Sequence, residues 1–187
     1  MSETLAILHG PIEADDDFNL TVVRYGGAVL MGRKTRGYGE GKLVLPGGKT
    51  RFYIGASGMG ILPFASEAAR EATEETGLAV SANQMRPMGV LHVADEDTRI
   101  VRLYEARLAI RPSDVKSGEL EDIDWIDESE LQYDHMPDDY RLWLPHVLAG
   151  YAVTAFFESD GHQVVEGQVF RQRLDPLGRA ELLEVQL

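Results

Sequence analysis

The chain has 187 residues, of which 44% are hydrophobic and 26% are charged, and this length and composition predict one globular domain. Its formal net charge of −13 excludes non-specific binding of nucleic acid polymers or anionic membranes, since both depend on a positive protein surface. The absence of Cys excludes disulfides and thiol chemistry, and without an apolar run of about 20 residues or a basic signal sequence we expect a cytoplasmic protein that enters no membrane.

The first elements that the pattern predicts are strands. Residues 1–18 show no clear periodicity and are interpreted as a loose lead-in. Alternating apolar residues predict a strand over Phe18–Tyr25 and a returning strand over Ala28–Arg33, because Gly26-Gly27 between them is a hairpin turn signal. A short strand is expected over Lys42–Leu45.

A basic, glycine-rich segment follows the predicted hairpin. Three glycines within residues 35–41 free the backbone to approach a ligand, and Tyr38 among them can stack on it. Between positions 33 and 51 the sequence has one acid, Glu40, and six of the chain's 18 bases, namely Arg33, Lys34, Arg36, Lys42, Lys49 and Arg51. Such a cluster suits a nucleoside triphosphate, and the alternative is a basic surface turn.

Three carboxylates share one face of a helix predicted over Ser66–Thr76 and ended by Gly77. Glu71, Glu74 and Glu75 stand at i, i+3 and i+4, which brings them within about 6 Å of each other. Because like charges at this spacing repel, they favour a counter-charge, and oxygen ligands suit Mg²⁺ or Mn²⁺. The alternative is a solvated acidic face.

The segment around these acids, R-E-A-T-E-E-T-G-L at residues 70–78, resembles the second half of the Nudix box, and L-P-G-G-K at residues 45–49 resembles the glycine loop that opens it. The resemblance implies a Mg²⁺ (or Mn²⁺) site in which Glu71 and Glu75 hold the metal and Glu74 assists. It also implies catalytic roles for Glu74 and Glu75, with Arg70 orienting a Glu. The family's leading Glu is missing, because its position corresponds to Ile54 or Leu62, depending on which half-motif the count starts from.

The stretch between the two half-motifs, Thr50–Phe64, is longer than the family's by about eight residues and contains no acid. Its glycines loosen the backbone and its apolar side chains offer area to bury. We expect either a lid over the site or a loop packed on the domain or on a second subunit, so the protein would be a monomer or a homodimer.

The rest of the pattern predicts further strands and two helices. These are strands over Met85–Val93, Thr98–Ile110 and Glu119–Ile126, helices over Glu128–Leu131 and Tyr140–Leu148, and a hairpin of Tyr151–Glu158 with Gln163–Arg173. This order predicts an α/β (α+β) fold with a mixed sheet between helices. The resemblance implies the Nudix α/β/α sandwich over residues 19–175, followed by a tail over residues 176–187.

Further segments resemble Nudix members that hydrolyse oxidised purine nucleotides, namely R-G-Y-G-E-G-K at residues 36–42, M-P-D-D at 136–139 and W-L-P at 143–145. They imply a small-molecule nucleotide substrate whose base is read by Asp138 and Asp139, two adjacent carboxyls that can hold one proton between them. The other implied substrate-binding residues are Lys34, Tyr38, Gly48, Lys49, Met136 and Trp143. From the residues alone, the better interpretation is that Asp138 or Asp139 is the N-cap of the next helix, and only the resemblance favours base reading.

Two replacements and one further acid bear on specificity and catalysis. Val44 stands where those members have Asn, and Met136 where they have Trp, so we expect several purine nucleotides to be accepted. Glu119 lies six residues before Trp125, where many Nudix proteins place an acid that reaches the metal or its water. Glu121 is the alternative, and either is also consistent with a solvated edge strand.

Together these features predict a Mg²⁺-dependent pyrophosphohydrolase, similar to 8-oxo-dGTP diphosphatases, that converts a purine nucleoside triphosphate to the monophosphate and pyrophosphate. One alternative is hydrolysis of another nucleoside diphosphate derivative, such as ADP-ribose or a dinucleoside polyphosphate. The other is a Nudix-fold module that binds nucleotide without turnover, because the leading Glu is missing.

Overall fold

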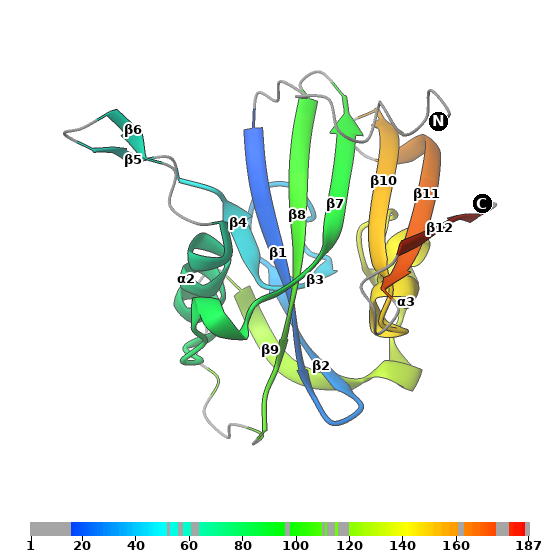
Figure 1. Ribbon diagram of the computed structural model, residues 1–187. Coiled ribbons are helices and arrows are strands. Elements are labelled where there is room, and N and C mark those ends of the chain that lie inside the picture. Colours follow the sequence, from blue (N-terminus) through cyan, green and yellow to red (C-terminus); the bar gives the residue numbers. More distant parts are fainter. Residues whose placement is uncertain are drawn as a thin grey trace.

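The computed structural model describes residues 16–51, 53–55, 58–60, 64–95, 98–109, 111, 115, 120–160, 163–174 and 180–185. Within these ranges ten strands form one sheet in the order β12-β11-β10-β7-β8-β1-β2-β3, with β4 paired to β1 and β9 paired to β2 (Figure 1). Their bounds are β1 Asp16–Tyr25, β2 Ala28–Lys34, β3 Leu43–Val44, β4 Gly47–Lys49, β7 Arg86–Ala94, β8 Thr98–Arg107, β9 Leu120–Asp127, β10 Ala152–Ser159, β11 Val164–Leu174 and β12 Ala180–Val185. A separate hairpin pairs β5 (Tyr53–Gly55) with β6 (Gly58–Gly60).

The sheet is mixed, as expected. Strand β1 runs parallel to β8, and β7 runs parallel to β10, whereas the other pairs are antiparallel. The helices are α2 (Phe64–Thr76) and α3 (Tyr140–Leu148), and short 3₁₀ turns cover Ala82–Gln84, Glu128–Glu130 and Tyr133–His135. In the described part of the chain, no helix is long and apolar enough to cross a membrane.

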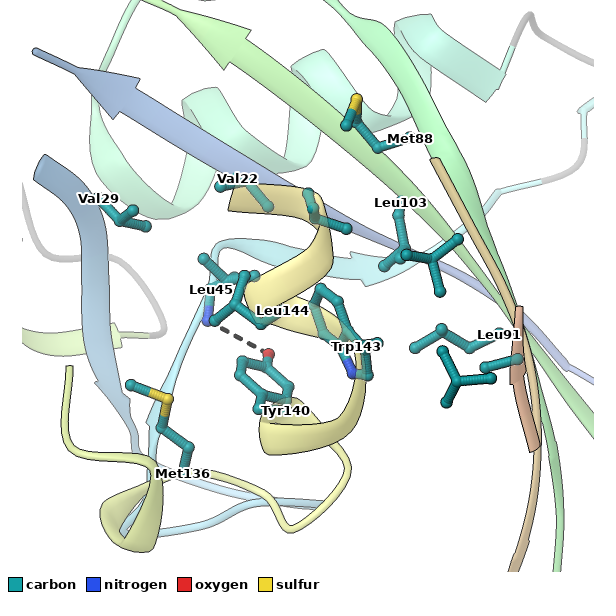
Figure 2. Close-up of a cluster of buried hydrophobic side chains, with 14 of the residues drawn as sticks. Val22, Val29, Leu45, Met88, Leu91, Leu103, Met136, Tyr140, Trp143 and Leu144 are labelled. Carbon is teal, nitrogen blue, oxygen red and sulfur yellow. Dashed lines mark hydrogen bonds between the residues drawn. The ribbon is translucent and has the colours of Figure 1, made fainter. Parts of the chain in front are cut away.

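Two hydrophobic cores lie on opposite faces of the sheet. Val22 and Val23 are both fully buried, and because neighbouring strand residues point to opposite faces, each belongs to a different core. Val22 packs in the cluster that contains Trp143 and Leu144 of α3 (Figure 2). Val23 packs in the cluster that contains Ala68 of α2. The expected sandwich of a mixed sheet between helices is therefore confirmed.

The observed elements differ from the predicted ones mainly at their ends. Helix α2 begins two residues earlier than predicted and ends where Gly77, at φ 70°, leaves the helical conformation. The predicted helix over Glu128–Leu131 is instead a 3₁₀ turn, whose N-cap Asp127 accepts a hydrogen bond from the Ser129 N–H. Strand β12 lies within the segment predicted as a tail and pairs with β11.

Candidate active site

The glycine loop after β3 passes close to both β1 and α2. A Cβ on Gly47 would come within 2.1 Å of the carbonyl oxygen of Asn19, and a Cβ on Gly48 would come within 2.7 Å of a carboxylate oxygen of Glu71. Glycine is therefore needed at both positions because strand and helix approach the backbone so closely. Pairing of β4 with β1 is what brings the two half-motifs of the sequence together.

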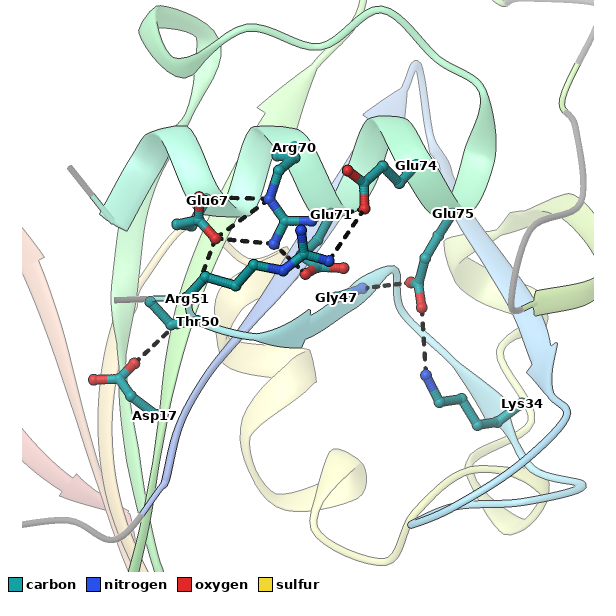
Figure 3. Close-up of polar contacts among 10 residues, drawn as sticks. All are labelled: Asp17, Lys34, Gly47, Thr50, Arg51, Glu67, Arg70, Glu71, Glu74 and Glu75. Carbon is teal, nitrogen blue, oxygen red and sulfur yellow. Dashed lines mark hydrogen bonds and ion pairs between the residues drawn. The ribbon is translucent and has the colours of Figure 1, made fainter. Parts of the chain in front are cut away.

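Glu75 is held against this loop and is only 3% exposed. Its Oε2 accepts a hydrogen bond from the Gly47 N–H at 2.7 Å, and its Oε1 accepts one from Lys34 Nζ at 3.3 Å (Figure 3). Burial raises the pKa of Glu75 above its usual value, although both of these donors oppose that effect. Burying the charge of a carboxylate is costly, so nearby positive charge stabilises its ionised form. A divalent cation supplies such charge.

The guanidinium of Arg70 lies among the other acids of α2. It donates to Glu67 from Nε and Nη2, to Glu71 from Nη2, and to Glu74 from Nη1 at 2.7 Å (Figure 3). The hydrogen bond with Glu67 is the largest of the effects that raise the pKa of Arg70, so the guanidinium stays charged. In this structure, arginine balances the repulsion expected among the acids.

The three predicted metal ligands therefore divide into two groups. Glu71 and Glu75 face the loop of Gly47 and Gly48, whereas Glu74 lies farther from the loop with a side chain that is 52% exposed (Figure 3). Among the described residues, no three His, Cys, Asp or Glu side chains form a preassembled metal cluster. The donors are hard carboxylate oxygens, which fit Mg²⁺ or Mn²⁺. Glu71 and Glu75 are the better placed of the three for direct contact with a metal.

The two predicted base-reading acids point to different environments. Asp139 is 8% exposed, and its Oδ2 accepts a hydrogen bond from Trp143 Nε1 at 2.8 Å, while its Oδ1 has no hydrogen-bond partner among the described residues. Burial raises the pKa of Asp139 against the opposing hydrogen bond from Trp143. Asp138 is partly exposed and pairs with Lys42 at 3.6 Å. Of the two acids only Asp139 is buried, whereas Asp138 lies beside Lys42, so the expectation that the two carboxyls share a proton stays a prediction.

Asp139 occupies the N-cap position of α3, as the alternative interpretation expects. Its backbone is already helical, however, and its side chain makes no capping hydrogen bond. The carboxylate instead turns into the core, where it accepts a hydrogen bond from Trp143.

The other predicted substrate-binding residues are only partly brought together. Met136 and Trp143 are fully buried in the α3 core, and the Gly39 backbone lies close enough to Val44 and Pro137 for a Cβ to touch both, at 3.5 and 3.6 Å. The predicted glycine-rich loop is thus next to the base-reading segment. The remaining two, Tyr38 and Lys49, are more exposed: Arg99 stacks over the Tyr38 ring at 5.1 Å, and Lys49 forms an ion pair with Asp16.

The fourth acid proposed for catalysis stays a prediction. Glu119 lies outside the described residues. Its alternative, Glu121, is exposed on β9 and stands opposite Arg33 in the pairing of β2 with β9.

Comparison with known proteins places this arrangement in a known fold. No family model matches the chain. The oxidized purine nucleoside triphosphate hydrolase of Danio rerio is 28% identical over 152 residues, which cover 78% of this chain and 88% of that protein. The MutT protein of Bacillus halodurans has a TM-score of 0.63 at 17% identity, over 82% of this chain and 97% of that one. The chain has the fold of the MutT-like Nudix hydrolases.

A second solved Nudix structure was obtained with ligands. The bifunctional NMN adenylyltransferase/ADP ribose pyrophosphatase of Francisella tularensis, complexed with AMP and a Mn ion, has a TM-score of 0.55 at 18% identity, over 79% of this chain and 45% of that one. These likenesses confirm the predicted Nudix resemblance and fold class.

One buried acid of this candidate site was not predicted from the sequence. Glu67 is 1% exposed and bonds to Arg70, although it belongs to neither half-motif. Its spacing of three residues from Arg70 on a helix was the available signal, since residues at i and i+3 are neighbours.

Proposed function

We propose that the chain is a divalent-metal-dependent Nudix hydrolase that cleaves purine nucleoside triphosphates to the monophosphate and pyrophosphate. The observation that carries the proposal is the position of Glu75, which is buried between the Gly47 N–H and Lys34. It places an acid suited to a metal beside a cation suited to a phosphate. The hydrolase class also has support from the Danio rerio enzyme, whose similarity covers most of both chains.

Each of these residues has a defined task in the reaction. Water adds to phosphorus, the bridging P–O bond breaks, and pyrophosphate leaves with the bond's electron pair. When bound, Mg²⁺ or Mn²⁺ supplies charge neutralisation and an activated water. Glu71 and Glu75 would hold the metal, and Lys34, which donates to Glu75 in this structure, would donate to a phosphate oxygen of the substrate. Arg70 keeps Glu71 and Glu74 oriented.

The base would be read at the buried acid Asp139. Its unpartnered Oδ1 is available to a purine edge, and a carboxyl with a raised pKa can donate as well as accept. Val44, 7% exposed, offers only apolar contact beside the glycine-rich loop. We therefore propose that oxidised and ordinary purine triphosphates are both accepted, because one base-reading amide is missing.

A second candidate substrate is ADP-ribose. The fold is shared with the Francisella tularensis ADP ribose pyrophosphatase, and an apolar Val44 sets no requirement for a guanine edge. A panel that includes ADP-ribose, dinucleoside polyphosphates, dGTP and 8-oxo-dGTP distinguishes these substrates.

The test measures by chromatography the nucleotide product and its co-product (pyrophosphate, phosphate or ribose 5-phosphate) formed from this panel with Mg²⁺, with Mn²⁺ and with EDTA. We expect metal-dependent release that Glu75→Gln lowers by about 100-fold or more, since charge stabilisation at the reacting phosphate is lost. Glu158→Gln is the matched control, because it removes an exposed carboxylate on β10, away from the glycine loop and α2. Nucleotide binding by calorimetry without any product would instead support the non-catalytic module, and release that is unchanged in Glu75→Gln would refute the proposed site.

A further inference from the structure

Glu67 is a buried carboxylate that the described reaction does not yet use. It lies in the first turn of α2 and is 1% exposed, which places it among the largest fully buried side chains. A buried carboxylate is costly unless charged or polar donors satisfy it. The groups that donate hydrogen bonds to Glu67 therefore indicate which parts of the site it holds in place.

The first donor is the backbone on the other side of the site. The Arg51 N–H donates to Glu67 Oε2 at 3.2 Å (Figure 3). The residue before it, Thr50, is 4% exposed and bonds to Asp17 of β1 through both its backbone N–H, at 2.7 Å, and its hydroxyl, at 3.2 Å. Glu67 thus ties the start of α2 to the chain that leaves β4, which is itself fixed to the sheet.

The second donor is Arg70, whose Nε and Nη2 both point at Glu67. The distances to Glu67 Oε2 are 3.3 Å from Nε and 2.9 Å from Nη2. A guanidinium is planar and its five N–H groups have fixed directions, so anchoring the Nε side sets the direction of the other side. Nη2 also donates to Glu71, and Nη1, on the other side, donates to Glu74.

Glu71 is consequently enclosed from two directions. Arg70 donates to its Oε1, and its Oε2 lies over the Gly48 backbone, where a Cβ would be 2.7 Å away. Without Glu67, Arg70 would be free to rotate and form a two-pronged pair with either remaining acid, which would compete with a metal for its oxygens.

We propose that Glu67 is a positioning residue that substitutes, from inside the helix, for the carboxylate missing from the loop before it. It holds Arg70 so that Glu71 stays directed at the glycine loop in a form ready for a divalent metal. The inference rests on the proposed function, in that it takes Glu71 to be a metal ligand. The inference goes beyond the proposed function because it assigns the role of holding Arg70 to Glu67, a residue outside both half-motifs.

The experiment compares Glu67→Gln with Glu105→Gln in the full chain. Glu105 is also 1% exposed and pairs with three arginines, Arg24, Arg86 and Arg107, which lie outside the site. Calorimetry with Mn²⁺ alone, well below the lower melting temperature, should show affinity lowered by about 10- to 100-fold in Glu67→Gln, the usual effect of losing a group that orients a metal ligand. Affinity in Glu105→Gln should stay within about twofold of the wild type.

Two further readouts separate positioning from a general loss of stability. Hydrogen exchange of the Arg70 Nε–H in the metal-free protein, assigned by its loss in Arg70→Lys, should accelerate in Glu67→Gln and not in Glu105→Gln. The double variant of Glu67→Gln and Arg70→Lys should bind Mn²⁺ no more weakly than Arg70→Lys alone, since Glu67 acts through Arg70.

The inference is overturned if Glu67→Gln keeps wild-type Mn²⁺ affinity and Nε–H exchange, or if the two losses multiply in the double variant. A wild-type protein that binds no Mn²⁺ overturns the proposed function, whereas the exchange measurement still decides whether Glu67 holds Arg70. If Glu67→Gln does not fold, Glu67→Asp replaces it, because the shorter acid keeps its charge but cannot reach both Arg51 and Arg70.

Discussion

Asp139 gives the sharpest test of how this protein reads a base, because the structure predicts opposite effects on stability and on activity. Its carboxylate is buried, accepts one hydrogen bond from Trp143, and leaves Oδ1 without a partner among the described residues. Asp139→Asn keeps the size of the side chain and an oxygen that can accept from Trp143. It removes the charge.

The expected gain in stability follows from the raised pKa of Asp139. When an acid has a higher pKa in the folded state than in the unfolded state, the protein loses stability as pH rises above the unfolded pKa. The reason is that the unfolded chain ionises first. Each pKa unit of this difference corresponds to about 1.4 kcal/mol. Asp139→Asn should therefore be more stable than the wild type at pH 7, and the difference should shrink as pH falls toward the unfolded pKa of Asp, about 4.

Activity should change in the other direction. An asparagine amide presents a fixed donor, whereas a protonated carboxyl can present either a donor or an acceptor through Oδ1. The mismatch should cost about 1 to 3 kcal/mol, which is roughly 5- to 150-fold in kcat/KM for purine triphosphates. Urea denaturation between pH 4 and 8 and kcat/KM on the nucleotide panel measure the two effects on one set of proteins.

The result that would refute this reasoning is a loss of stability in Asp139→Asn that is larger at pH 7 than at pH 4. It would mean that the folded protein stabilises the ionised form of Asp139. Trp143→Phe provides the control, since it removes the donor to Oδ2 and should lower stability most where Asp139 is ionised.

Three further predictions concern the core, the base pocket and the inserted stretch. Burial opposes ionisation of Glu105, but its arginine partners lower its pKa overall. Its contribution to the free energy of unfolding is therefore present above the unfolded pKa and is lost as pH falls. Glu105→Gln should cost about 3 to 5 kcal/mol at pH 7 in urea denaturation, and less near pH 3. Val44→Asn should raise the ratio of kcat/KM between preferred and other purines by roughly tenfold, and an unchanged ratio would show that position 44 does not face the base. Replacing residues 55–61 by a short turn should leave Mn²⁺ affinity within about threefold while changing KM or the oligomeric state by light scattering; loss of metal binding would reveal a ligand there.

Most elements could be predicted because their signals are local. Helix α3 has the predicted bounds, and α2 ends at the predicted residue, where Gly77 adopts a positive φ. The hairpin of β1 and β2 turns at Gly26, also at positive φ, as the Gly-Gly pair indicates.

The order of strands in the sheet could not be predicted in the same way. Strand β1 runs parallel to β8, with Asp16 opposite Arg99, a separation of more than 80 residues that no local pattern records. Strand β4 is three residues of G-G-K, a sequence with little strand preference, and it exists because its backbone pairs with β1.

The site shows the same division between local and long-range information. Spacing correctly placed Glu71 and Glu75 near one another, but the separation of Glu74 depends on where Arg70 is anchored. Asp138 and Asp139 lie in the turn before α3 and enter different surroundings, one beside Lys42 and the other beside Trp143, although the sequence presents them as a pair. Only packing shows which of the two is buried.

The missing acid illustrates how a motif can fail while its physical requirement is still met. What the site needs is a carboxylate that fixes Arg70, and the chain position from which it comes is secondary to where it lies. Glu67 meets this need from within α2, where the i, i+3 spacing guarantees proximity to Arg70 whatever the conformation of the chain before the helix. On this proposal residues 52–63 need not supply that acid, so this stretch can be longer and apolar while the acids of α2 keep their positions. A search for the motif by position counts this chain as deficient, whereas a search by geometry finds the acid.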